Sequence, residues 1–296
     1  MTIENRQLLN SAGKDGKVTK IYCVGLFRTG TNTIFEVFNR SYRAGHEFML
    51  EQTLMSVHGY VSGQISRDEF IEFVRNRDVE GNLELDSYGF TYFFIDILVK
   101  EFPDAKFILT IRDCYSWVNS CIANVHRYYE EESIQGLLSL FSNIDHLPDN
   151  RFEWIDRSGN KVCLEQMIKI WNQVNTNILN TVPADRLLIL KTGDLADSLP
   201  ELAHFVGASV DDLDILHANK GDSINYLSCF EPVALEKIFD RHCRKLMSDI
   251  FPEIKFATYM KDGALEKIID PSDVGKIFSL QWEQADAPET LAADAS

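Results

Sequence analysis

A nine-residue run near the N-terminus has the residue types that suit an anion. Residues 25–33 read GLFRTGTNT, and they follow a predicted strand and open a predicted helix. In that context backbone N–H groups converge on an anion and the helix N-terminus adds its dipole. Gly25 and Gly30 permit a tight turn, and Thr31 and Thr33 supply hydroxyl groups or cap the helix. The run predicts a phosphate-binding loop.

The cation of this loop departs from the nucleotide-triphosphatase pattern. There, a lysine follows the second glycine and grips the β- and γ-phosphates, and the next hydroxyl holds Mg²⁺. Here Thr31 follows Gly30, and the cation is Arg28, two residues before that glycine. This argues against ATP hydrolysis and obligatory Mg²⁺. The plain alternative is a strand–turn–helix connection, in which an arginine between two loop glycines would have no purpose.

A second cation with a nearby hydroxyl ends another predicted strand. Arg112 lies at the end of the run KFILTI, and Ser120 follows eight residues later. A strand end followed by a helix brings both toward the carboxyl edge of a parallel sheet. Arginine offers a planar fork that matches a phosphate. Alone the spacing is common, but beside the first loop it indicates a second phosphate contact.

The elements that must position these residues alternate between short apolar strands and helices. We expect strands at 20–27, 83–85, 106–111 and 186–191. We expect helices at 31–42, 94–101, 115–129, 164–180, 198–206 and 232–250, with a loop containing a small hairpin at 142–161. The alternation predicts an α/β protein: a single domain with a central parallel sheet flanked by helices. We place this domain at 18–270, between a flexible arm at 1–17 and an acidic, disordered tail at 271–296.

Composition narrows the class of protein. The 296 residues carry 29 Lys+Arg against 45 Asp+Glu, a formal net charge of −16, which disfavours a nucleic-acid partner. The most apolar stretch, 91–99, contains Asp96 and is far shorter than the roughly 20 residues of a membrane span. No secretory signal is visible at the N-terminus. None of the six cysteines forms a C-x-x-C pair, so we expect reduced core thiols, no metal site and a cytoplasmic protein.

These motifs together resemble the sulfotransferases that use 3′-phosphoadenosine-5′-phosphosulfate (PAPS). The 5′-phosphosulfate loop of that family is similar to residues 27–32, and its 3′-phosphate motif is similar to Arg112 with Ser120. The stretches GLFRTGT and FPDAKFILTIRDCYSWVNS resemble the bacterial and fungal branch that carries Arg-Thr-Gly-Thr and Leu-Thr-x-Arg-Asp. Residues 183–207 are similar to the third core strand of the family and the helix after it. The likeness spans about residues 20–250.

The resemblance implies a phosphate-loop fold, PAPS as sulfuryl donor, PAP as product and no metal. The acceptor would be a small molecule, such as a bacterial natural product, carrying a hydroxyl or amine. The donor would be bound by Arg28, Thr29, Gly30, Thr31, Asn32, Thr33, Arg112 and Ser120. Two departures stand out: Arg28 replaces the lysine of cytosolic members, and the late Arg-Lys-Gly motif has only a partial counterpart in Lys220-Gly221.

The general base is open, because the Lys-Thr-His segment of cytosolic members is absent. Asp86 follows the expected strand at 83–85, which would put its carboxylate at the carboxyl edge of the sheet with Arg28 and Arg112. His46 follows the first helix, and a neutral histidine is a natural base for a hydroxyl. We favour Asp86 narrowly over His46, with Glu47 or Glu51 as further candidates. The acceptor pocket is expected from 46–77 and 115–142.

Two other functions compete with sulfuryl transfer. A small-molecule kinase would need a lysine after Gly30 and a metal-binding carboxylate, for which Asp113 is the candidate. A non-catalytic PAP-binding protein of the same fold would keep the phosphate motifs without an acceptor base.

Overall fold

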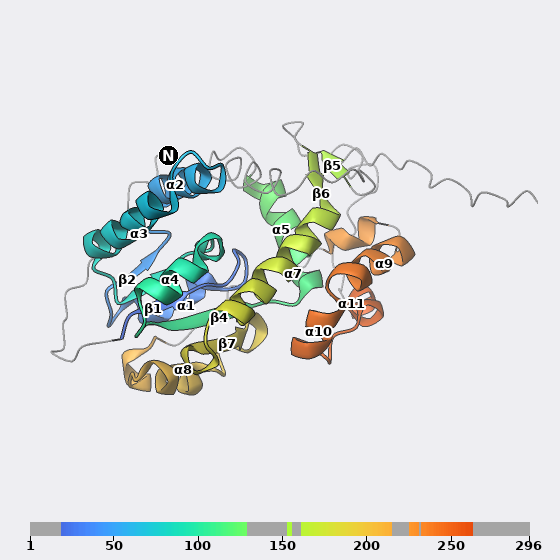
Figure 1. The fold of residues 1–296 in the computed structure, drawn as a ribbon. Coiled ribbons are helices and arrows are strands. Elements are labelled where there is room, and N and C mark those ends of the chain that lie inside the picture. The colour runs from blue at the N-terminus through green and yellow to red at the C-terminus, as the bar shows by residue number, and fades with distance from the viewer. Residues whose placement is uncertain (1–18, 129–152, 156–160, 215–224, 231, 263–296) are drawn as a thin grey trace, which may run out of the picture.

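The computed structural model describes residues 19–128, 153–155, 161–214, 225–230 and 232–262. Five parallel strands form the central sheet of this part of the chain (Figure 1). They are β1 (Ile21–Cys23), β2 (Ala44–His46), β3 (Leu85–Ser87), β4 (Lys106–Ile111) and β7 (Leu187–Lys191). Their order is β2-β3-β1-β4-β7, and each neighbouring pair is parallel. The expected α/β class with a parallel sheet is confirmed.

The strand order places a topological switch point between β1 and β4. The chain leaves β1 toward β2 and β3 on one side and then crosses to β4 on the other. In open α/β sheets, ligands bind outside the carboxyl ends of the strands at such a point. The loop after β1 and the segment after β4 therefore lie where a ligand is expected.

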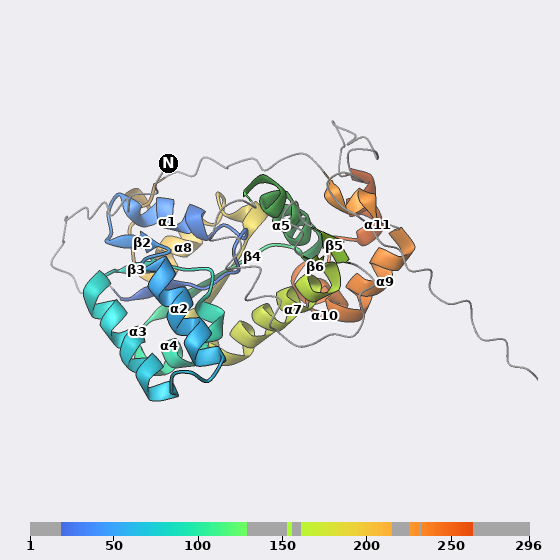
Figure 2. The same ribbon diagram turned by 90° about the horizontal axis from the view of Figure 1, so that it is seen from above.

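Helices cover both faces of the sheet, because alternate strand residues point to opposite sides. Figure 2 shows α1 and α8 on one side and α2, α3 and α4 on the other. Ile21 and Cys23 of β1 belong to the core on the α1–α8 side, whereas Tyr22 and Val24 belong to the larger core on the opposite side. Both faces of β1 are therefore buried, which explains its uninterrupted apolar sequence.

The α-helices cover most of the remaining described chain. They are α1 (Thr31–Asn39), α2 (Leu50–Val61), α3 (Arg67–Gly81), α4 (Ile95–Glu101), α5 (Cys114–Tyr128), α7 (Leu164–Thr181), α8 (Leu199–Val206), α9 (Pro232–His242), α10 (Arg244–Ile250) and α11 (Phe256–Asp262). Short 3-10 turns occur at Thr91–Phe93, Ala184–Arg186, Thr192–Asp194, Val210–Asp212 and Tyr226–Cys229. An antiparallel hairpin pairs β5 (Glu153–Ile155) with β6 (Lys161–Cys163), as expected.

The C-terminal helices α9, α10 and α11 lie to one side of the sheet, where α9 packs against α7 and the aromatic rings of α9 and α11 meet the start of α5 (Figure 1). The ring of Tyr115 lies edge-on to that of Phe239, with centroids 4.7 Å apart, and also contacts Phe256 and Tyr259. This aromatic cluster joins α5, α9 and α11. Since α5 begins just after Arg112, the cluster supports the segment that carries this arginine.

Four helices and strands were not expected from the sequence, and one strand was misplaced. The unexpected ones are β2, α2 and α3, which lie within residues 44–81, and α11. The strand expected at 83–85 is Leu85–Ser87 instead, two residues later. The helix expected at 232–250 is interrupted at Cys243, whose φ of −127° is not helical.

The described residues cover only part of the predictions on cysteines, membrane spans, the chain ends and Lys220-Gly221. Four cysteines, Cys23, Cys114, Cys121 and Cys243, are unpaired and buried. No helix in the described ranges is both long and apolar enough to cross a bilayer. The arm expected at 1–17, the tail at 271–296 and the pair Lys220-Gly221 lie outside the described residues.

Candidate active site

The loop between β1 and α1 depends on its two glycines. A Cβ at Gly25 would lie 2.1 Å from Oγ1 and 2.4 Å from the carbonyl oxygen of Thr110, so only glycine lets the loop approach β4 this closely. Gly30 has a φ of 106° and caps the N-terminus of α1, a left-handed conformation that favours glycine. The glycine spacing therefore reflects a close backbone contact at one end and a positive φ at the other.

Thr29 holds the loop together from inside. Its side chain is fully buried, and its hydroxyl donates to the carbonyl oxygen of Leu26 at 2.5 Å and lies 2.9 Å from Oγ1 of Thr110. Its backbone N–H also donates to Leu26. The hydroxyl and the N–H of Thr29 are therefore both bound within the loop and its contact with β4, and the role expected for Thr29 toward the donor stays a prediction.

Three side chains from other elements bind the carbonyl oxygens of the loop. Trp117 Nε1 donates to the carbonyl of Phe27 at 2.8 Å. Thr192 Oγ1 donates to that of Thr29 at 2.6 Å, and Ser87 Oγ to that of Thr31 at 2.8 Å. A loop that binds an anion must not present carbonyl oxygens to it, and these three are occupied. Gly30, Thr31, Asn32 and Thr33 form the start of α1, where the N–H groups have no intrahelical acceptor.

The two arginines expected to bind phosphates lie at one end of the sheet. Arg28 is exposed with a φ of 64°, and its Nε donates to Oγ of Ser120 at 3.2 Å. This hydrogen bond joins the loop after β1 to α5. Arg112 precedes α5, and its carbonyl accepts a hydrogen bond from Trp171 Nε1 at 2.9 Å. Both motifs therefore meet at the carboxyl edge of β1 and β4.

The charges of Arg28 and Arg112 also act on the buried thiol of Cys121, which lies next to Ser120 on α5. Burial raises its pKa, and the positive charges of Arg28 and Arg112 each act to lower it. Both charges therefore reach the same helix, in a chain whose net charge is −16. The site is a local positive region within an acidic protein, which suits an anionic ligand.

Asp113, the candidate metal ligand of the kinase alternative, lies just before the start of α5. It is buried, and its carboxylate accepts a hydrogen bond from the N–H of Ser116 at 2.9 Å, at the start of α5. Burial raises its pKa. Within the described ranges, no three His, Cys, Asp or Glu side chains are grouped so that they could hold a metal ion.

His46 ends β2 and lies beside the phosphate loop. Its Nε2 is 3.5 Å from Oγ1 of Thr31, the first residue of α1, and its ring centroid lies 6.0 Å from that of Phe35. Burial lowers its pKa, against the opposing charges of Glu47, Glu36 and Asp86. The imidazole is therefore neutral at neutral pH, the form that accepts a proton.

Asp86 has a different place from the one expected. It lies in the middle of β3, 2% exposed, and its two carboxylate oxygens accept hydrogen bonds from Nη1 and Nη2 of Arg77. Burial alone would raise its pKa, but pairing with Arg77 holds the pKa below its ordinary value. The expectation that Asp86 ends its strand and faces the open edge of the sheet is wrong, because β3 begins two residues later than predicted.

The remaining candidates lie around these groups. Glu47 follows His46 with a φ of 55°, and its N–H donates to the carbonyl of Ser87 at 3.0 Å. Glu51 is exposed in the first turn of α2. Sequence reasoning missed Trp117, Thr192 and Arg77. A signal existed for Thr192, a hydroxyl residue directly after the strand LLILK, at the edge where β1 and β4 also end.

Comparison with known proteins adds a domain assignment. A family model described as a sulfotransferase domain matches residues 20–224, which is more than half of the chain. No curated protein matches the sequence.

Solved structures similar to this chain share little sequence with it. A sulfotransferase from Alicyclobacillus acidocaldarius is 15% identical with a TM-score of 0.46, over 78% of this chain and 95% of that one. The sulfotransferase domain of the Synechococcus PCC 7002 olefin synthase is 16% identical with a TM-score of 0.38, over 94% and 92%. The sulfotransferase domain of the curacin biosynthetic pathway is 15% identical with a TM-score of 0.41, over 69% and 79%.

Proposed function

The chain belongs to the sulfotransferase domain family, and from this premise we propose that it transfers a sulfuryl group from PAPS to a hydroxyl or amine of a small-molecule acceptor, with PAP as the second product. The observation that carries the choice of donor is the hydrogen bond between Arg28 and Ser120. It brings the loop after β1 and the Arg112–Ser120 motif to one edge of the sheet, as a nucleotide with two separate phosphate groups requires.

The residues at this edge suit such a donor. The loop packs closely on Thr110 of β4 at Gly25, and three of its carbonyl oxygens accept hydrogen bonds from protein side chains. Arg28 and Arg112 supply positive charge. Arg28 and the first turn of α1 would hold the 5′-phosphosulfate, and Arg112 with Ser120 the 3′-phosphate. PAPS supplies the activated sulfuryl group; the chain must orient it, stabilise the leaving oxygen and accept a proton.

We assign the proton acceptor to His46 rather than Asp86. During transfer the bond from sulfur to the bridging oxygen breaks, a bond from sulfur to the acceptor oxygen or nitrogen forms, and the acceptor loses a proton. His46 Nε2 faces the phosphate loop in its neutral form, whereas both oxygens of Asp86 are bound to a buried arginine. Arg28 would meet the negative charge that develops on the bridging oxygen.

The test is a transfer assay with PAPS and a library of hydroxyl and amine acceptors, natural products among them. We expect an acceptor product heavier by one SO₃ group, and the same rate with EDTA. In a thermal-shift assay, PAP should stabilise the protein more than ATP with Mg²⁺. Mg²⁺-dependent phosphorylation would favour the kinase, and PAP binding without a sulfated product would favour a non-catalytic protein. A cytoplasmic setting, proposed with this function, agrees with four buried cysteines that form no disulfide.

A further inference from the structure

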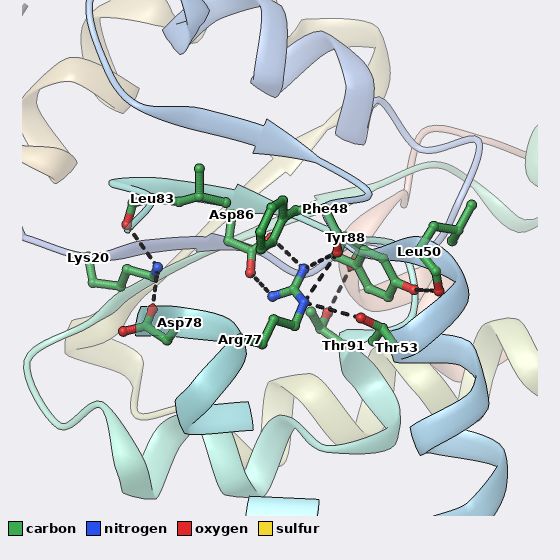
Figure 3. A network of polar contacts seen from close by, with 10 residues as sticks. All are labelled: Lys20, Phe48, Leu50, Thr53, Arg77, Asp78, Leu83, Asp86, Tyr88 and Thr91. Atoms are coloured by element: carbon green, nitrogen blue, oxygen red, sulfur yellow. Dashed lines mark hydrogen bonds and ion pairs between the residues drawn. The ribbon is translucent and has the colours of Figure 1, made fainter. Parts of the chain in front are cut away.

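A buried arginine lies beneath the strand that carries His46. Arg77 of α3 is 7% exposed, and its guanidinium reaches under the edge of the sheet to Asp86 of β3 (Figure 3). The register pairs Asp86 with Gly45 of β2 and with Tyr22 of β1. The ion pair therefore anchors α3 to the strand next to β2.

Two N–H groups of Arg77 donate to the turn that follows His46, residues 47–49. Its Nη2 and Nε donate to the carbonyl oxygen of Phe48 at 2.9 and 3.3 Å, and Nε also donates to Oγ1 of Thr53 at 3.2 Å. Its guanidinium lies 5.5 Å from the ring centroid of Phe48 and 5.2 Å from that of Tyr88. One side chain thus holds Asp86, the turn and α2 together (Figure 3).

The turn that Arg77 holds is strained. Glu47 and Met49, on either side of Phe48, have φ angles of 55° and 53°. Neither is glycine, and such residues persist in the left-handed region only where their surroundings enforce it. Arg77 supplies two hydrogen bonds to the carbonyl between them, so it stabilises the part of the turn most prone to relax.

The shape of this turn determines the position of His46. β2 is only three residues long and lies at the edge of the sheet, paired with β3 alone. His46 is its last residue, and the strained turn begins immediately after it. His46 also pairs with Ser87 of β3 and contacts the ring of Phe35, so a relaxed turn would move Nε2 away from Thr31, which lies 3.5 Å away here, without detaching the strand.

We propose that Arg77 is a positioning residue for sulfuryl transfer: anchored on Asp86, it holds the carbonyl of Phe48 and so fixes the turn that places His46 against the phosphate loop. The inference rests on the proposed function and assigns a role to an ion pair that is not part of the donor motifs. Lysine cannot replace Arg77, because one ammonium group does not span both the carboxylate and the carbonyl as a planar fork does.

The test is a double-mutant cycle between Arg77 and His46. Arg77→Lys keeps a positive charge beside Asp86 but loses the forked contact with Phe48. We expect kcat to fall about 10- to 100-fold, the scale of a displaced catalytic group, with unchanged affinity for PAP. In the His46→Asn background the same change should cost little more, because Arg77 acts through the histidine. The matched control is Asp78→Asn. Asp78 lies on α3, one residue after Arg77, and pairs with Lys20; its substitution should leave kcat unchanged.

A second variant separates positioning from stability. Arg77→Met with Asp86→Leu removes both buried charges, a change that is often neutral for folding, while the Phe48 carbonyl still loses its donor. We expect a melting temperature near that of the wild type and a low kcat. Wild-type kcat in this variant, or equal losses from Arg77→Lys with and without His46, would overturn the proposal. Wild-type protein that yields no sulfated acceptor would instead overturn the proposed function.

Discussion

The two halves of the candidate site are held in place by different means. The donor half, at the ends of β1 and β4, is shaped by backbone: Gly25 against Thr110, Gly30 at the helix start, and carbonyls bound by Trp117 and Thr192. The acceptor half, at the ends of β2 and β3, is held by the buried ion pair of Arg77 and Asp86 under a short edge strand. β1 and β4 each have a neighbouring strand on both sides, whereas β2 pairs with β3 alone and depends more on the side chains packed beside it.

This difference predicts how each half responds to substitution. In the donor half, the side chains expected to meet the ligand, Arg28 and Arg112, are distinct from those that shape the loop. Their removal should change binding or rate and leave the fold intact. In the acceptor half, His46 depends on Arg77 and Asp86, so a substitution that removes only one member of this buried ion pair should lower both rate and stability.

The largest effect is expected for His46→Asn. Asparagine cannot take the proton from the acceptor, so kcat should fall about 10²- to 10⁴-fold, the range for loss of a general base, while PAP affinity stays unchanged. His58→Asn, on an exposed position of α2, is the control. Normal turnover in His46→Asn together with a collapse in Asp86→Asn would return the role to the aspartate.

The pH profile gives an independent check on the same residue. Burial lowers the pKa of His46, so the neutral form persists to lower pH than in a free histidine. The rate should fall on acidification with a midpoint below about 6.5, the ordinary histidine value, as His46 gains its proton. Histidine NMR titration should show the same midpoint, and His46→Asn should remove this limb of the profile. A midpoint above the ordinary value would contradict the assignment.

Arg28→Ala should come next in size. If the guanidinium meets charge that builds on the bridging oxygen, kcat should fall about 10²- to 10³-fold, the scale of one transition-state donor, and PAP affinity should fall less. The melting temperature should hardly change, because Arg28 is exposed. A lower melting temperature with an unchanged rate per folded molecule would give Arg28 a purely structural role.

Arg112→Ala tests the nucleotide end of the donor half. Loss of a charged hydrogen bond to the 3′-phosphate should weaken PAP about 10- to 100-fold and barely affect adenosine 5′-phosphosulfate, which lacks that group. Arg75→Ala, which removes an ion pair between α3 and Glu101 of α4 away from the donor motifs, is the control. Equal losses for both nucleotides, measured by calorimetry, would move Arg112 away from the 3′-phosphate.

The same contrast explains how much the sequence could predict. The donor half is encoded locally: the strand at 106–111 was predicted at its observed bounds, and each phosphate motif lies within ten residues of its strand. Parallel strands then bring the two motifs to one edge. The position of Thr29 could not be predicted, because its burial depends on Thr110, which lies 81 residues away.

The acceptor half lacks such local signals. β2 is three residues with a glycine in the middle, too short for a periodic pattern, and α2 starts after Met49 with no side-chain cap. α3 did carry a readable start, the capping box of Ser66 and Glu69. The pairing of Arg77 with Asp86 follows only from packing α3 against β3, so a two-residue error in the strand was enough to misplace Asp86.

The smallest effect is expected where a side chain supports the donor loop without meeting the ligand. Thr192 Oγ1 lies between two carbonyl oxygens, 2.6 Å from that of Thr29 and 3.1 Å from that of Ile111. Thr192→Val keeps the shape but removes the hydroxyl, which should lower the free energy of unfolding by about 1–3 kcal/mol. The carbonyl of Thr29 would then be free to turn toward the anion, so PAP affinity should fall several-fold while kcat at saturating donor is kept.

The control is Ser198→Ala, which removes a similar hydroxyl bonded to the carbonyl of Asp194 away from the loop. It should change stability slightly and PAP affinity not at all. Chemical denaturation and calorimetry measure both quantities. If Thr192→Val lost stability but bound PAP as the wild type does, the loop would hold its shape without this hydrogen bond, through Gly25, Gly30, Trp117 and Ser87.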